Sequence, residues 1–248
     1  MALLWQKRAG DNHYQVRSHG ASVRLYSNGV FHSQWNPRDP LKGSLWEMLL
    51  LPAFFLPRRQ IRSVLLLGVG GGALIRLLQR YITPDRIVGV ELDAVHLQIA
   101  RKYFGVRDVE LVHADARDYV AAQLTAGDMC AFDLIIDDLF GHCGGAAERA
   151  VVADQSWCEQ LLQLLGPDGL LVANFGSRSE LLASGWRSSA IRRQLRGAWT
   201  AEHPAYENCI LAASRSALSV VDLTAQAPDP INPGNPRSRL PCQLKRLP

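Results

Sequence analysis

The sequence has few of the features that mark metal-binding, membrane-spanning or nucleic-acid-binding proteins. Its five cysteines include no CxxC pair, so no zinc site is expected, and their odd number favours a reduced, cytoplasmic setting. The longest apolar stretch, residues 46–56, contains Glu47 and Pro52 and is too short to span a bilayer. The apolar run at residues 2–5 is too short to predict a signal peptide. The formal net charge of only +4 does not favour a nucleic-acid partner.

The composition instead suits one folded α/β domain with smaller additions. The 248 residues are 48% hydrophobic and 20% charged, which allows a sizeable core without disulfides or metal. We expect an N-terminal β-hairpin and helix subdomain over residues 1–58 and a ligand-binding α/β domain over residues 59–222. A proline-rich tail over residues 223–248 is expected to be extended or disordered.

Strand and helix patterns alternate along the expected α/β domain. Short apolar runs predict buried strands at residues 64–67, 87–90, 109–112, 132–136, 170–174 and 208–213. Helical segments separate the strands, including one over residues 179–195, and a polar loop is expected over residues 137–147. This alternation predicts a Rossmann-like, doubly wound, mostly parallel sheet.

The N-terminal part carries a different pattern. Residues 13–35 alternate in polarity like β-strands, and Asn28-Gly29 between them is a strong hairpin signal. A helix is expected to begin at Ser44, because Glu47 lies at capping-box spacing from it.

Glycines follow the first strand of the α/β domain at Gly68, Gly70, Gly71 and Gly72. Without Cβ atoms, a backbone can turn tightly and approach a ligand closely. Because Gly68, Gly70 and Ala73 also fit the dinucleotide fingerprint, this loop alone leaves NAD open as the ligand.

Acidic residues follow the next three strands. Glu91 ends the second strand, where a carboxylate can accept hydrogen bonds from both ribose hydroxyls. Asp115, just before Ala116, can accept from an adenine amine or cap a helix. Asp137 and Asp138 end the fourth strand, and one of them is expected to face the cleft as a base or amine anchor. Because the carboxyl ends of parallel strands meet at one edge, these groups predict a single adenosyl ligand.

At these residues the chain resembles the spermidine synthase family of polyamine aminopropyltransferases, on a class I methyltransferase-type fold. The likeness covers roughly residues 20–215. It is carried by the glycine loop, the ribose-binding segment, the adenine segment and the catalytic strand at residues 65–76, 88–104, 109–118 and 132–137. The resemblance implies S-adenosylmethionine or its decarboxylated form as cofactor, held by the four loop glycines with Glu91, Asp115, Ala116 and Asp137, and a possible homodimer.

Several residues depart from that family's pattern. The family's glycine loop has an Asp that holds the aminopropyl amine, and this chain has Gly71 there. His32 stands in place of a glutamine after the hairpin. In the family's Asp-x-x-Asp motif, the second acid anchors the polyamine. This chain keeps the first acid as Asp137 but has Phe140 at the second position. A polycation needs several carboxylates, so this loss favours a less cationic or more apolar acceptor.

The acceptor site is expected to include the helix that begins near Ser44. The family's Tyr-His-Glu on that helix corresponds to residues 45–47 of this chain. The residues predicted to contact the acceptor are Trp46, Glu47, Asp138, Phe140 and Tyr206.

Three functions remain open from the sequence. The favoured hypothesis is an S-adenosylmethionine-dependent methyltransferase acting on a small-molecule acceptor, with Asp137 as base or orienting group. The second is an aminopropyltransferase with atypical amine recognition, in which Asp137 takes the amine proton. The third is a non-catalytic homologue that binds a nucleoside or a protein partner.

Overall fold

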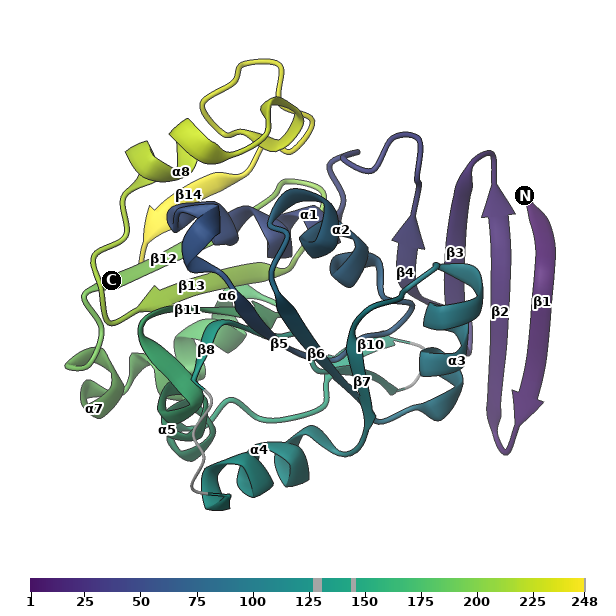
Figure 1. The fold of residues 1–248 in the computed structure, drawn as a ribbon, viewed down its shortest axis with the longest axis horizontal. Coiled ribbons are helices and arrows are strands. Elements are labelled where there is room, and N and C mark those ends of the chain that lie inside the picture. The colour runs from purple at the N-terminus through teal and green to yellow at the C-terminus, as the bar shows by residue number, and fades with distance from the viewer. Residues whose placement is uncertain (127–130, 144–145, 248) are drawn as a thin grey trace.

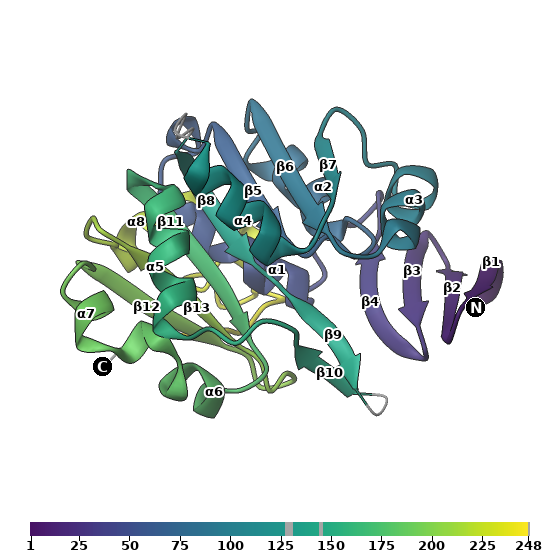
Figure 2. The ribbon, with the colours of Figure 1, turned by 90° about the horizontal axis from the view of Figure 1, so that it is seen from below.

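The computed structural model describes residues 1–126, 131–143 and 146–247. A large central sheet forms the middle layer, helices cover both of its faces, and a separate N-terminal sheet stands at one side (Figures 1 and 2). Within the described ranges, none of the helices has the length and apolar character needed to cross a membrane.

The central sheet has eight strands in the order β14-β12-β13-β11-β8-β5-β6-β7. They are β5 (Ser63–Leu67), β6 (Arg86–Glu91), β7 (Glu110–His113), β8 (Phe132–Asp137), β11 (Leu165–Phe175), β12 (Gly197–Glu202), β13 (Cys209–Ser214) and β14 (Gln243–Arg246). The strands from β11 to β7 pair in parallel. The β11–β13, β13–β12 and β12–β14 pairs are antiparallel. The predicted doubly wound, mostly parallel sheet is therefore confirmed.

The helices pack on two apolar cores, one on each face of the sheet. They are α1 (Leu45–Leu50), α2 (Ala73–Tyr81), α3 (Ala94–Tyr103), α4 (Ala116–Thr125), α5 (Gln155–Leu164), α6 (Arg178–Ala183), α7 (Ser189–Arg192) and α8 (Val220–Gln226), with short 3₁₀ turns η1 (Leu51–Phe55), η2 (Arg58–Gln60), η3 (Gly185–Arg187) and η4 (Asp229–Ile231). Successive strand residues point to opposite faces. Leu66 of β5 accordingly joins one core, and Leu65 and Leu67 join the other.

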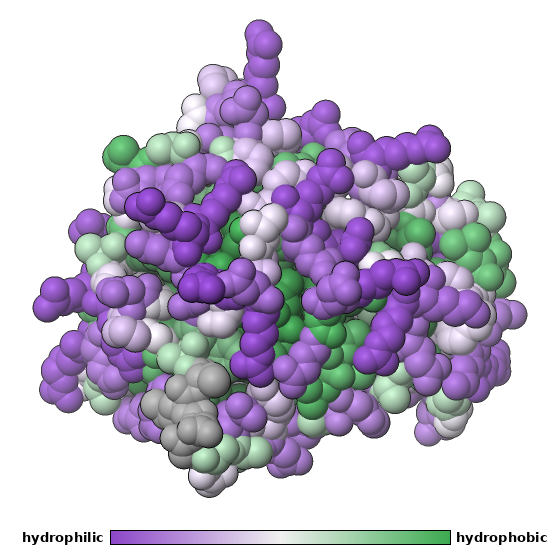
Figure 3. All heavy atoms as spheres, in the orientation of Figure 1, coloured by the Kyte–Doolittle hydropathy of each residue, from purple (hydrophilic) through white to green (hydrophobic). Residues whose placement is uncertain are grey.

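The N-terminal sheet is a four-stranded antiparallel meander of β1 (Ala2–Ala9), β2 (Asn12–His19), β3 (Ser22–Ser27) and β4 (Val30–Trp35). The predicted hairpin at Asn28-Gly29 is confirmed. Both residues have positive φ, 52° and 82°, the conformation that favours Asn-Gly in two-residue turns. The first strand, β1, was not predicted. Leu3 and Leu4 on it are exposed, and apolar residues are visible at that margin of an otherwise mostly hydrophilic face (Figure 3).

Two segments differ from the sequence-based expectation. The polar loop expected over residues 137–147 instead contains the hairpin of β9 (Phe140–Cys143) and β10 (Ala146–Arg149). The helix expected over residues 179–195 is divided into α6, η3 and α7. Ser177 and Ser188 each cap a new helix start with their side chains, which gives the backbone an alternative to one continuous helix.

The prediction of an extended or disordered tail is wrong for its described residues. Residues 220–226 form α8, which packs on η1, and β14 adds a strand to the edge of the central sheet. Leu223, Ile231 and Leu240 are fully buried. Proline content alone was therefore misleading, because apolar residues between the prolines have a core to pack against.

Candidate functional site

A cavity of about 730 Å³ lies at the carboxyl ends of β5, β6, β7 and β8. This is the edge where open α/β sheets bind ligands. The N-terminal sheet, α1 and the β9–β10 hairpin complete its walls through residues such as Tyr14, Trp46 and Phe140. Two sheets far apart in the sequence therefore build one cavity.

Only the first part of the glycine loop between β5 and α2 lines the cavity. Gly68 and Gly70 line the cavity. Gly68 has φ of 89°, and a Cβ there would collide with the carbonyl oxygen of Asp138. Glycine is therefore required for the close approach of the loop to β8.

Gly71 and Gly72, predicted to contact the cofactor, are not among the described residues that line the cavity. A Cβ on Gly71 would lie 2.7 Å from both the Phe104 ring and the Ser33 Cβ. The space beside Gly71 is thus already occupied by the end of α3 and by β4. An acidic side chain at this position has no room without a shift of its neighbours.

Glu91 lies where predicted, at the end of β6 and in the cavity wall. Its Oε2 accepts hydrogen bonds from the N–H groups of Val69 at 3.0 Å and Gly70 at 2.8 Å, and its Oε1 accepts from that of Asp93 at 2.9 Å. Burial opposes ionisation, but His96 and these N–H groups outweigh it and hold the pKa of Glu91 below its ordinary value. Glu91 is therefore an ionised, oriented carboxylate.

Asp115 and Ala116 also line the cavity, as predicted. Asp115 is at the same time the N-cap of α4, because its Oδ1 accepts the N–H of Arg117 at 2.8 Å. The Arg117 guanidinium bonds to the same carboxylate and lowers the pKa of Asp115. The capping and cavity-lining roles, alternatives in the sequence, are both fulfilled by one side chain.

Asp137 and Asp138 point to opposite faces of the sheet. Asp137 is fully buried outside the cavity wall, where it pairs with the Arg149 guanidinium and accepts a hydrogen bond from Trp157 Nε1 at 2.9 Å. Asp138 lines the cavity, and its Oδ1 accepts from Asn174 Nδ2 at 2.8 Å. The geometry does not support the cofactor-binding and catalytic roles assigned to Asp137 and places Asp138 in the cavity instead.

The chemistry of Asp138 differs from that of its neighbour. Loss of water around the side chain is the main reason that the pKa of Asp138 rises to about 7, and the nearby Asp137 charge adds to this. A carboxyl with a pKa near neutrality can exchange a proton at physiological pH. If the Asp-x-x-Asp motif begins at Asp138, its second position is Gly141, which also lines the cavity. That position then still lacks an acid.

The other predicted acceptor contacts divide into two groups. Trp46 and Phe140 line the cavity, together with Phe31, whose ring meets that of Trp46 edge-on at 5.2 Å. Glu47 does not line it. Its carboxylate caps α1 by accepting from the Ser44 N–H and hydroxyl.

Tyr206 also lies outside the cavity wall, with its ring 5.1 Å from that of His203. The next two residues, Glu207 and Asn208, line the cavity instead. Asn208 Nδ2 donates to Asn174 Oδ1 at 3.0 Å, and Asn174 in turn holds Asp138. Sequence reasoning missed this chain of amides, although Asn174 stands at the end of a predicted strand.

The fold and cavity place the chain among α/β ligand-binding domains of the class I methyltransferase type. A family model described as the spermine/spermidine synthase domain matches residues 47–183, more than half of the chain. The chain belongs to this family.

The relatives that match this chain are named either as methyltransferases or as polyamine aminopropyltransferases. The eEF1A lysine and N-terminal methyltransferase homolog of Drosophila melanogaster is 26% identical over 133 residues, which covers 51% of this chain and 20% of that protein. The polyamine aminopropyltransferase of Pyrobaculum neutrophilum is 32% identical over 123 residues, covering 46% of this chain and 41% of that protein. The chain thus matches less than half the length of either relative.

Solved structures show the same fold. A probable spermidine synthase from Corynebacterium glutamicum superposes with a TM-score of 0.75 at 20% identity, covering 99% of this chain and 91% of the other. Human methyltransferase-like protein 13 in complex with SAH superposes with a TM-score of 0.61 at 19% identity, covering 73% and 87%.

Proposed function

We propose that this chain is an S-adenosylmethionine-dependent methyltransferase acting on a small acceptor with an apolar body. The observation that carries this proposal is the closed space at Gly71, which leaves no room for an aminopropyl-anchoring acid. The aromatic wall of Phe31, Trp46 and Phe140 and the near-neutral pKa of Asp138 support an acceptor that is less cationic than a polyamine.

The residues present fit an adenosyl cofactor. A carboxylate has about four lone-pair positions, and the three backbone N–H groups on Glu91 leave one on Oε1 for a ribose hydroxyl. Asp115 stands at the end of the neighbouring strand, where it can accept from an adenine amine. The bare backbone at Gly68 and Gly70 allows the ligand to approach the loop closely.

When bound, S-adenosylmethionine supplies a methyl carbon activated by its sulfonium, and transfer leaves a neutral thioether. The chain aligns the acceptor and receives its proton. Trp46 and Phe140 would hold the apolar body of the acceptor and so align its heteroatom with that carbon. The proton lost by the heteroatom passes to the carboxylate of Asp138, which Asn174 orients.

A second candidate is aminopropyl transfer from decarboxylated S-adenosylmethionine. The presence of Glu207 in the cavity wall beside Asn208 favours it, because a second carboxylate in addition to Asp138 helps to hold a cationic amine. Family membership is compatible with either reaction.

Titration calorimetry with S-adenosylmethionine, its decarboxylated form, methylthioadenosine and NAD tests the proposal. We expect S-adenosylmethionine to bind at least about tenfold more tightly than the decarboxylated form, a difference of about 1.4 kcal/mol. The reverse preference supports aminopropyl transfer. Binding of none of the four ligands contradicts both reactions and favours a non-catalytic homologue.

A further inference from the structure

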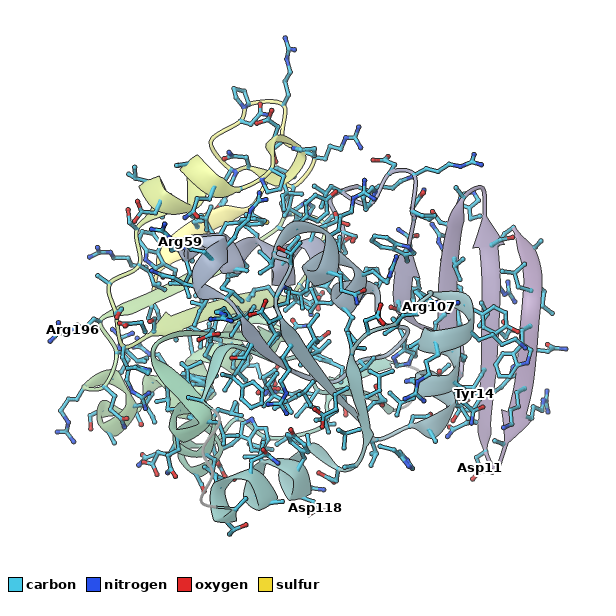
Figure 4. The ribbon with its side chains drawn as sticks, viewed as in Figure 1. Asp11, Tyr14, Arg59, Arg107, Asp118 and Arg196 are labelled. Carbon is cyan, nitrogen blue, oxygen red and sulfur yellow. The ribbon has the colours of Figure 1, made fainter. Side chains whose placement is uncertain are left out.

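Four polar side chains and one imidazole meet between the N-terminal sheet and α3, behind the expected ribose position. The imidazole is that of His96 on α3, which is 7% exposed. Its Nε2 lies 2.8 Å from the Ser27 hydroxyl of β3 and 4.0 Å from Asp93 Oδ2, and its Nδ1 lies 3.8 Å from Glu91 Oε1. The Tyr14 hydroxyl of β2 donates to Asp93 Oδ2 at 2.6 Å, and Figure 4 shows Tyr14 on β2 beside α3.

The charges in this cluster favour a cation at the imidazole. Two carboxylates, Glu91 and Asp93, lie on either side of one imidazole, and all three are at least partly removed from water. Two buried like charges repel each other strongly unless a positive group lies between them. Among the described residues, the other titratable groups facing His96 are Tyr14, whose ring meets the imidazole edge-on at 5.8 Å, and His32 of β4, at 5.2 Å.

We infer that protonated His96 is a positioning residue for the cofactor: it holds Glu91 and Asp93 together and keeps the Glu91 carboxylate aimed at the ribose. It acts through Glu91 rather than on the ligand's reacting atoms. Ser27 fixes the ring because its hydroxyl oxygen accepts a hydrogen bond from the Nε2–H group, so the N-terminal sheet takes part in cofactor binding. The inference rests on the proposed function for the identity of the ligand.

This arrangement makes cofactor affinity depend on pH. Burial disfavours the charged imidazole, but the adjacent carboxylates of Glu91 and Asp93 outweigh burial and raise the pKa of His96 above its ordinary value of 6.5. A raised pKa in the folded state means that the stabilisation is present at low pH and is lost as pH rises through the folded value. Affinity should therefore fall as the solution becomes alkaline.

The test combines calorimetry and NMR on the full chain. Binding of S-adenosylmethionine is measured between about pH 6 and about pH 9, across the titration range of a perturbed histidine. We expect the wild type to lose affinity about tenfold over this range, whereas His96→Gln binds weakly at every pH, as the wild type does at the alkaline end. The matched control is His113→Gln, because His113 is exposed on β7 and outside the cavity wall.

A second variant tests whether the pH dependence comes from the His96 imidazole rather than from the neighbouring Tyr14 hydroxyl. Tyr14→Phe removes the hydroxyl bonded to Asp93 but keeps the imidazole, so it should lower affinity less and keep the pH dependence. Titration of the His96 ring signals in the ligand-free protein reports the pKa without any cofactor. If the pKa of His96 is raised in the ligand-free protein but no adenosyl ligand binds, the proposed function is contradicted, whereas the protonated imidazole between Glu91 and Asp93 is not. Wild-type pH dependence in His96→Gln, or an unraised pKa, would overturn the inference.

Discussion

Substitution of Asp138 by Asn is expected to make the protein more stable at alkaline pH. The Asp138 side chain is partly buried in the cavity wall, and the pKa of its carboxyl rises from an ordinary value of 3.8 to about 7, chiefly because loss of water penalises the charge. Between these two pKa values, the folded protein keeps a proton on Asp138 that the unfolded chain has lost. Stability therefore falls as pH rises from 3.8 towards 7.

The size of this change in stability follows from the difference between the ordinary and the raised pKa of Asp138. About three pKa units correspond to about 4 kcal/mol, and the opening of the cavity to water reduces this to about 2 kcal/mol. Because Asn carries no charge, Asp138→Asn should exceed the wild type in unfolding free energy by about 2 kcal/mol at about pH 8. The advantage should shrink steadily as pH falls.

Urea unfolding followed by tryptophan fluorescence, repeated across pH, measures this difference. Asp118→Asn is the matched control, since Asp118 is exposed on α4 at the edge of the molecule (Figure 4), and this variant should show no gain in stability at alkaline pH. A less stable Asp138→Asn variant at alkaline pH would refute the reasoning about burial. The same variant should retain S-adenosylmethionine binding while transfer slows by about 10²–10⁴-fold, as for loss of a general base.

Three further substitutions test other parts of the site. Arg149→Met should lower the unfolding free energy by about 3–5 kcal/mol in urea, because it leaves buried Asp137 without its cation, and a loss below about 1 kcal/mol contradicts a buried ion pair. Glu91→Gln should weaken adenosyl-ligand binding by about 1.5–3 kcal/mol in calorimetry, whereas the exposed Glu110→Gln control should not. Gly71→Ala should reduce thermal stability by about 1–3 kcal/mol, since its Cβ meets the Phe104 ring and Ser33; an unchanged melting temperature would show that the space is open.

Much of the fold could be predicted because its signals are local. A buried parallel strand needs a short apolar run, and a helix needs a periodic face and a cap. The strand that ends at Glu91 and the strand that precedes Asp115 follow these rules, and so does the Asn28-Gly29 hairpin. The tail could not be predicted in this way, because Leu240 is buried by residues distant in the sequence.

Local sequence is enough to predict the order of strands and helices, the bare glycine loop and the acids at strand ends, since each depends on neighbouring residues. That Asp138 rather than Asp137 faces the cavity depends on how the chain packs. Adjacent strand residues point to opposite faces, and which face holds the ligand depends on how distant segments pack. The contacts of His96 with Ser27 and of Asp93 with Tyr14 likewise exist only once the N-terminal sheet lies against α3.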